Sequence, residues 1–167
     1  MATDPADYPA ANARFGAVAM RLSDYFNEVV AENASLATSF PGDLRLAINA
    51  IMTLDGFCGS LHAELLQTGK ITDLPERDDD WKEIVAQQDN MYRVLRDTSY
   101  ELRHGNLTGK KPRLVRRSDH ASHADVVLIN ASDTDYQAVE VINAVALIAR
   151  EWLENVPRYR IPRGNRS

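Results

Sequence analysis

Apolar residues recur at intervals of three and four along most of the chain, which is the spacing of one face of an α-helix. The pattern predicts four amphipathic helices, near residues 10–34, 42–67, 80–104 and 134–156. Three of them are followed by residues that commonly end helices, namely Gly69, Gly105 and Pro157. Long helices with short connections favour an all-α fold built as an antiparallel four-helix bundle.

The period changes between the third and fourth predicted helices. The runs "RLVRR" at 113–117 and "DVVLIN" at 125–130 are short and rich in β-branched residues, and the polar stretch "SDHASHA" joins them. Runs of this kind indicate strands. We therefore expect a small β-hairpin between helices three and four.

Length and composition indicate one domain. A chain of 167 residues that is 44% hydrophobic is long enough to bury its own core. We place a single helical-bundle domain at 10–156, between a flexible N-terminus at 1–9 and a mobile basic tail at 157–167. Cys58 is the sole cysteine, and no stretch resembles a secretory signal or a membrane span. These features predict a cytoplasmic protein without disulfides and without contact to a membrane.

Charge is distributed unevenly along the sequence. Residues 1–90 hold 6 Lys and Arg against 15 Asp and Glu, whereas residues 91–167 hold 13 against 9. A basic segment follows the third helix and is a candidate for contacts with RNA phosphates. Its candidate residues are Arg103, Lys110, Lys111, Arg113, Arg116 and Arg117. The same residues are equally compatible with a solvated face of the hairpin, and the net charge of −5 argues against a protein that coats nucleic acid.

The third predicted helix holds one candidate catalytic set, Arg96, Asp97 and His104. A histidine can take and return a proton, and an arginine can stabilise the charge that builds on a phosphorane during RNA cleavage. In the alternative interpretation, Arg96 forms a salt bridge inside the bundle and His104 caps helix carbonyls. On the second helix, Asp55 and His62 share one stripe. The structural alternative there is that Asp55 pairs with an arginine of helix three and His62 reaches the rim.

The stretches "LDGFCGSL" in one helix and "LRDTSYELRHGNLT" at the end of another resemble the HEPN superfamily of small prokaryotic helical domains. Active members are similar in carrying an arginine, a polar residue, a spacer and a histidine at the end of a helix that pairs across a dimer. The resemblance implies a metal-independent endoribonuclease, related to toxins or defence, that acts on RNA as a homodimer, needs no cofactor and has an antitoxin-like partner. Its catalytic residues would be Arg96, Asp97 and His104, although seven residues separate Arg96 from His104, one more than the usual spacing.

Two other functions are compatible with the sequence. A HEPN-like bundle whose Arg and His are displaced resembles a non-catalytic interaction or adaptor module that forms a homodimer. The distinguishing feature is whether Arg96 and His104 face one cleft or separate environments. A metal site at His120 and His123 is the third option, but the loop between the strands supplies no fixed third ligand.

Overall fold

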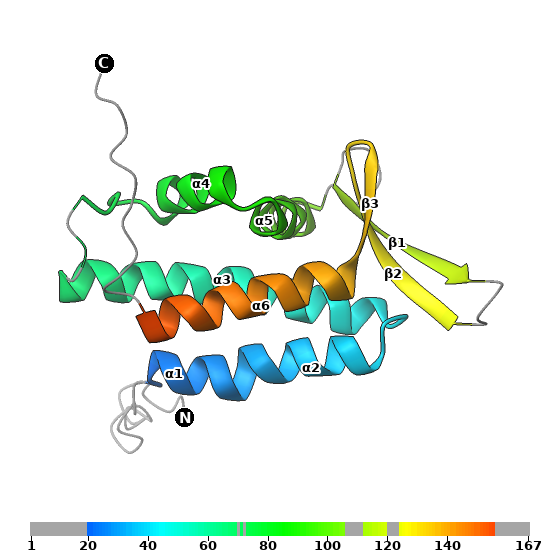
Figure 1. The fold of residues 1–167 in the computed structure, drawn as a ribbon, viewed down its shortest axis with the longest axis horizontal. Coiled ribbons are helices and arrows are strands. Elements are labelled where there is room, and N and C mark those ends of the chain that lie inside the picture. Colours follow the sequence, from blue (N-terminus) through cyan, green and yellow to red (C-terminus); the bar gives the residue numbers. More distant parts are fainter. Residues whose placement is uncertain (1–19, 70, 72, 106–111, 120–123, 156–167) are drawn as a thin grey trace, which may run out of the picture.

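The computed structural model describes residues 20–69, 71, 73–105, 112–119 and 124–155 (Figure 1). Helices make up most of this part of the chain, and a three-stranded antiparallel sheet lies at one end of them. The predicted helical class is therefore confirmed. The expected N-terminus at 1–9 and C-terminal tail at 157–167 lie outside the described residues.

The first helical stretch runs without a break through α1 (Leu22–Tyr25), a π-helical segment (Phe26–Val30) and α2 (Ala31–Ser39). The residues at both junctions keep right-handed helical angles, with φ −57° at Tyr25 and −68° at Val30. The predicted helix 10–34 ended too early, and residues 10–19 lie outside the described part.

The second helix, α3 (Leu44–Thr68), agrees closely with the predicted range 42–67. Its start is fixed by Asp43, whose carboxylate accepts hydrogen bonds from the backbone N–H groups of Arg45 and Leu46. It ends at Gly69, whose φ of 60° is the left-handed conformation that glycine adopts most easily.

The single helix predicted at 80–104 is wrong, because the structure has two helices there, α4 (Asp78–Gln88) and α5 (Asn90–Arg103). Asp89 between them is extended, with φ −131° and ψ 116°, and its side chain accepts a hydrogen bond from the N–H of Tyr92 at 2.8 Å. An aspartate that caps a new helix also ends the preceding one, since its own backbone leaves the helical region. The apolar stripe continues through this break and conceals it.

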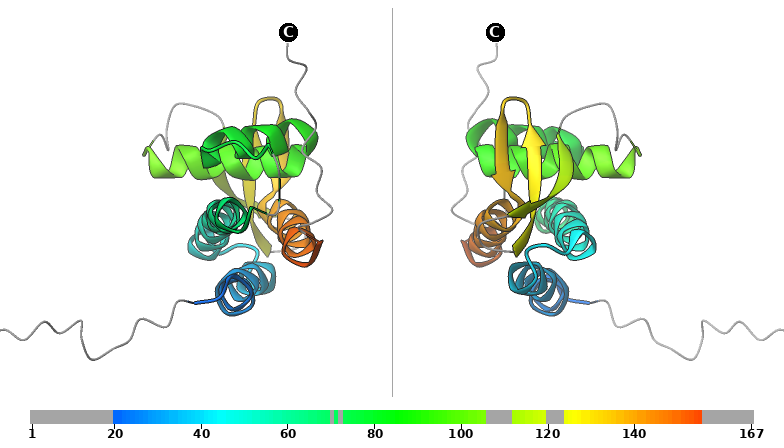
Figure 2. Two further views of the ribbon diagram at one scale, coloured as in Figure 1. Left: turned by 90° about the vertical axis from the view of Figure 1, so that its left-hand side faces the viewer. Right: turned by 90° about the vertical axis from the view of Figure 1, so that its right-hand side faces the viewer.

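The break changes the architecture. Seen end-on in Figure 2, α2, α3 and α6 form a triangle, and α5 lies across them. In Figure 1, α3 and α6 both run away from the sheet, in the same direction. The expected antiparallel four-helix bundle is therefore replaced by three packed helices with α4 and α5 as a further layer, because the turn at Asp89 points α5 away from the common axis.

The predicted hairpin is a sheet of three strands in the order β1-β2-β3: β1 (Arg113–Asp119), β2 (Ala124–Ala131) and β3 (Thr134–Gln137). Residues 134–137, which were predicted to open the last helix, pair with β2, and α6 covers Ala138–Asn155. Ser132 and Asp133 form the two-residue turn, with Ser132 at φ 52°. Tight turns of this kind favour direct pairing of the flanking strands.

The turn between α2 and α3 attaches the sheet to the helices. The N–H of Val127 donates to the carbonyl of Pro41 at 2.9 Å. A Cβ atom at Gly42 would lie 2.6 Å from the Cβ and the carbonyl oxygen of Asp125. Only glycine allows the two backbones to approach this closely.

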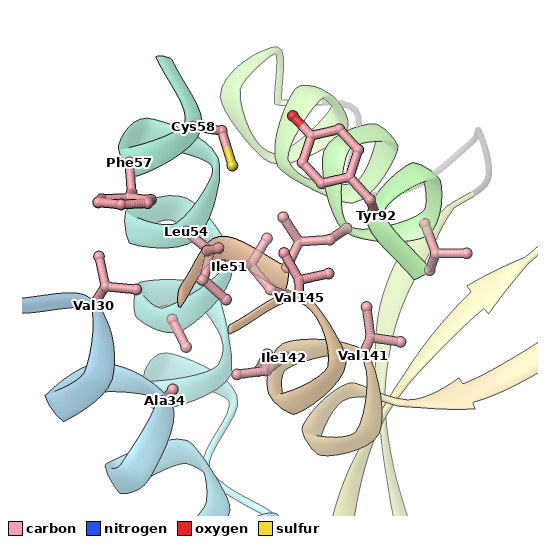
Figure 3. Close-up of a cluster of buried hydrophobic side chains, with 14 of the residues drawn as sticks. Val30, Ala34, Ile51, Leu54, Phe57, Cys58, Tyr92, Val141, Ile142 and Val145 are labelled. Carbon is pink, nitrogen blue, oxygen red and sulfur yellow. The ribbon is translucent and has the colours of Figure 1, made fainter. Parts of the chain in front are cut away.

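The hydrophobic core lies between the helices and the inner face of the sheet, and Figure 3 shows its central part. Leu54 of α3 and Leu95 of α5, which lie on the apolar faces of their helices, are fully buried. The other large, fully buried side chains come from every layer: Phe26, Ile51, Phe57, Leu61, Tyr92, Ile129 and Ile142. No helix in the described part of the chain is long and apolar enough to cross a membrane.

Candidate functional site

A cluster of charged and polar side chains is buried where α3, α4 and α5 meet. Asp55 of α3 is only 2% exposed. Its Oδ1 lies 3.3 Å from Nζ of Lys82, and its Oδ2 lies 2.8 Å from Nη2 of Arg103 and accepts a hydrogen bond of 2.9 Å from Oγ of Ser99. Lys82 also lies 3.5 Å from the carboxylate of Asp78. One side chain from α3 thus connects α4 and α5.

The cluster satisfies groups that are costly to bury. A charge removed from water needs paired charges and hydrogen bonds to offset its lost hydration. The interpretation that Asp55 pairs with an arginine of the third predicted helix is correct, and the partner is Arg103. His62 does not reach the rim, because it is buried, with its Nε2 2.7 Å from the carbonyl oxygen of Pro75 and its ring stacked on Trp81.

Two further titratable groups lie in this interior. Burial, followed by the negative charge of Asp55, raises the pKa of the Cys58 thiol to about 12. Burial also raises the pKa of the Tyr92 hydroxyl. Because the thiolate is the reactive form of cysteine, Cys58 is a core residue rather than a nucleophile.

Arg96, the first predicted catalytic residue, is held by α4. Its guanidinium donates to the carboxylate of Glu83. Burial lowers the pKa of Arg96, but the hydrogen bond and the charge of Glu83 outweigh it and raise the pKa, while the same hydrogen bond lowers the pKa of Glu83. The alternative interpretation, a salt bridge within the helical layers, is the observed geometry.

Asp97, the second predicted residue, is half-buried beside this pair. Burial raises the pKa of its carboxyl group, although the charges of Arg96 and Arg93 oppose the change. Its neighbour Thr98 is directed inward, where its hydroxyl donates to the carbonyl of Val94. Asp97 therefore lies at the boundary between the core and the surface.

His104, the third predicted residue, is exposed at the C-terminal end of α5. Its ring centroid lies 4.2 Å from that of Tyr100, and its backbone N–H donates to the carbonyl of Tyr100 at 3.1 Å. Eight positions along a helix correspond to a rise of about 12 Å and a rotation of about 80° from Arg96. Arg96 and His104 thus occupy separate environments, one against α4 and one at the end of α5.

The predicted RNA-contacting residues divide into two groups. Arg103 is paired with Asp55, and Arg116 donates to Asp125, which also accepts a hydrogen bond from Ser118 at 2.8 Å. The hydrogen bonds from Ser118 and Arg116 lower the pKa of Asp125. Arg113 and Arg117 are exposed on β1.

Lys110, Lys111, His120 and His123 lie outside the described residues. Within the described part, no three His, Cys, Asp or Glu side chains are grouped as metal ligands.

Sequence reasoning missed the partners that decide these environments, namely Lys82, Glu83 and Ser99. Lys82 follows three consecutive aspartates and stands four residues after Asp78, a spacing that places the two side chains together on a helix. That spacing was the available signal. Nothing in the sequence alone indicates that Lys82 also reaches α3.

The chain was compared with known protein families, with curated proteins and with solved structures, and none of them matches it.

Proposed function

We propose that this chain is a non-catalytic helical interaction module that acts as a homodimer. The observation that carries this proposal is that Arg96 pairs with Glu83 and Arg103 pairs with Asp55, so the two arginines of α5 nearest to His104 are held by carboxylates. A proton-transfer group and a phosphorane-stabilising cation have to converge on one reacting phosphate. The separation of these residues favours binding over cleavage.

The surface best suited to a second copy is a groove of about 370 Å³ between α2 and α6. Its walls include Ala31, Ala34 and Ala146, and its floor includes Phe26. Leu147 projects beside it and is 69% exposed. A large apolar side chain next to a groove lined by small residues is suited to a self-complementary contact, in which each copy fills the groove of the other.

Charge complementarity supports the same occupant. Arg150 lies at the groove, with its guanidinium carbon 5.5 Å from the centroid of the Phe26 ring. Glu28 is exposed in the π-helical segment that precedes Ala31. In a two-fold arrangement we expect the arginine of one copy to meet this carboxylate of the other, and the contact to occur twice.

The oligomeric state in solution tests this proposal. Light scattering after size exclusion should give the mass of a dimer for the wild type and of a monomer for Leu147→Glu. Leu66→Glu is the matched control, since Leu66 is also an exposed leucine, at 42%, but belongs to α3. A monomeric wild type, or a dimer that both variants preserve, would contradict an interface at the α2–α6 groove.

A second candidate function is metal-independent cleavage of RNA. This is the function that the HEPN resemblance implies, together with an antitoxin-like partner. The observation that favours it is the exposed imidazole of His104 against Tyr100, one residue from Arg103, whose side chain remains 45% exposed. Labelled RNA incubated with the protein and EDTA tests it. Cleavage that persists with EDTA and disappears in His104→Ala would support this function, whereas undiminished cleavage by the variant would exclude His104.

A further inference from the structure

The outer edge of β1 carries backbone groups that the sheet does not use. β1 is at one side of the sheet and pairs only with β2. Val127 of β2 directs its N–H to Pro41, away from β1. In an antiparallel strand pair, the backbone N–H and C=O groups of two opposite residues either all point toward the neighbouring strand or all point away from it. Arg116, which stands opposite Val127, therefore directs its own N–H and C=O toward the free edge.

The same alternation places the backbone groups of Leu114 and Ser118 on this edge. Among the described residues, none forms a backbone hydrogen bond with that side of β1. The comparison with β2 is informative, because Pro41 covers the part of its edge that extends beyond β3. Among the described residues, Pro41 thus covers one stretch of β2, whereas the outer side of the seven-residue strand β1 has no backbone partner.

The side chains of β1 give this edge a positive charge. Arg113 and Arg117 lie on one face of the strand with Val115 between them, because strand residues alternate between faces. Arg113 and Arg117 are exposed and form no ion pair with any carboxylate whose side chain the structure describes, whereas Arg116 on the opposite face is paired with Asp125. Two exposed cations therefore lie on either side of a half-buried valine.

We propose that the edge of β1 binds an extended acidic segment of a partner protein, which adds to the sheet as a fourth strand. This inference rests on the proposed role of the chain as an interaction module. The free N–H and C=O groups supply hydrogen bonds to the added strand. Two acidic residues four positions apart on that strand pair with Arg113 and Arg117, and an apolar residue midway between them packs on Val115.

Charge disfavours a second copy of β1 as the occupant. The two-fold antiparallel registers that pair most of the strand are centred on Val115, Arg116 or Arg117. The first places Arg113 opposite Arg117 of the other copy, and the others place an arginine opposite itself, while the register centred on Arg116 also places Arg113 opposite Asp119. Like charges directly opposite each other destabilise a strand pair. The arginines thus oppose self-pairing and favour an acidic strand.

Chemistry also favours a peptide over RNA. Sheets that bind single-stranded RNA usually stack its bases on exposed aromatic rings. The side chains on the outer face of this sheet include no aromatic ring within the described strands: Arg113, Val115, Arg117, Val126, Leu128, Asn130, Asp135 and Gln137. An unpaired strand edge, with donors and acceptors in alternation, matches a peptide backbone instead.

The first experiment tests charge. A labelled seven-residue peptide, Thr-Glu-Thr-Val-Thr-Glu-Thr, matches the length of β1 and carries Glu, Val and Glu on one face. It is titrated with the full chain and followed by fluorescence anisotropy. The wild type should bind it, and a peptide with Lys in place of Glu should not bind. Arg113→Glu with Arg117→Glu should weaken binding at least about tenfold. Arg21→Glu with Arg77→Glu, which reverses two exposed arginines elsewhere, should change it less than about twofold.

The second experiment tests strand addition. Arg116→Pro and Arg116→Ala both remove the pair with Asp125, but only proline removes the N–H that points to the free edge. Arg116→Pro should therefore bind the peptide about tenfold more weakly than Arg116→Ala. If circular dichroism shows that the proline variant does not fold, amide exchange in the wild type replaces it, and the amides of Arg116 and Ser118 should exchange more slowly when the peptide is bound.

Specific outcomes would overturn the inference. Equal affinities of the folded Arg116→Pro and Arg116→Ala variants, or unchanged amide exchange, would rule out strand addition. Another such outcome is that single-stranded RNA displaces the peptide and loses its own binding in the Arg113→Glu, Arg117→Glu variant. That result would show that the edge binds polyanions in general, and it would overturn a site for an acidic peptide. If the wild type is a dimer but does not bind the peptide, the proposed strand addition is wrong and the proposed homodimer stands. If the wild type binds the peptide but is a monomer, only the proposed homodimer is wrong.

Discussion

Two sets of side chains on α5 contain similar residue types in different circumstances. In the inner set, Ser99 and Arg103 contact the buried carboxylate of Asp55. In the outer set, Arg96 pairs with the half-exposed carboxylate of Glu83, and His104 lies against Tyr100 at the surface. An arginine seven residues from another on the same helix thus has a different role, because the two meet different neighbouring helices.

The difference shows that the burial of the carboxylate, rather than the residue type, assigns these side chains their roles, since Asp55 is buried and Glu83 is half-exposed. A buried ion pair that loses one member leaves the other charge without hydration or a partner. An exposed pair that loses one member is largely replaced by water. The inner set therefore stabilises the junction of α3, α4 and α5, and the outer set is available for other contacts at little cost in stability.

The largest expected effect comes from removing the centre of the inner set. Asp55→Ala should lower the free energy of unfolding by about 3–5 kcal/mol, because Lys82 then remains buried without its main partner. Urea denaturation measures the loss. Asp55→Leu combined with Lys82→Met should recover most of it, since matched apolar residues need no hydration. A loss below about 1 kcal/mol for Asp55→Ala would show that the inner set is no more important than a surface pair.

The next effect concerns the apolar core beside the cluster. Leu54→Ala or Leu95→Ala should lower the free energy of unfolding by about 2–5 kcal/mol, the usual cost of deleting a fully buried leucine. Leu66→Ala, at an exposed position on α3, should stay within about 0.5 kcal/mol. An unchanged midpoint for Leu54→Ala would mean that the core lies elsewhere.

The helical class and most core positions could be predicted, because helix faces repeat in the sequence. The apolar spacing of α3 and α6 persists over many turns, and tertiary packing reinforces it. The break at Asp89 could not be found from spacing alone, since Leu95 continues the stripe of Trp81 across it. Strand β3 was missed because its four residues precede α6 directly and alternate only briefly.

The candidate site was harder to predict than the fold, because the environment of each side chain depends on contacts between helices. Arg96 and Arg103 have nearly equal directions in a helical projection, so spacing cannot tell which one meets Asp55. The answer depends on where α3 and α4 cross α5. Asp55 shares a stripe of α3 with apolar residues, and a polar residue among apolar ones was the most informative sign available.

A smaller effect is expected for the outer ion pair. A double-mutant cycle with Arg96→Ala and Glu83→Ala should give a coupling of less than about 1 kcal/mol, as is usual for pairs near solvent. Because the pKa of Glu83 is lowered in the folded protein, the contribution of the pair is present above the carboxyl's ordinary value of about 4.3 and disappears as the pH falls through its folded value. A coupling energy as large as the stability loss in Asp55→Ala would remove the distinction between the inner set and the outer set.

The smallest effect is expected at His104. The residue is exposed at the end of α5 and contacts Tyr100, which is also exposed, so His104→Ala should change the free energy of unfolding by no more than about 0.5 kcal/mol. Thermal unfolding at neutral pH measures it, with Tyr100→Ala as the matched variant that removes the other ring. If both substitutions leave the melting temperature unchanged, the ring contact contributes nothing to the fold, and any loss of RNA cleavage or partner binding in His104→Ala reports directly on function. A clear drop in stability for His104→Ala alone would instead show that the imidazole helps to end α5. The outer set would then have a structural role, as the inner set does.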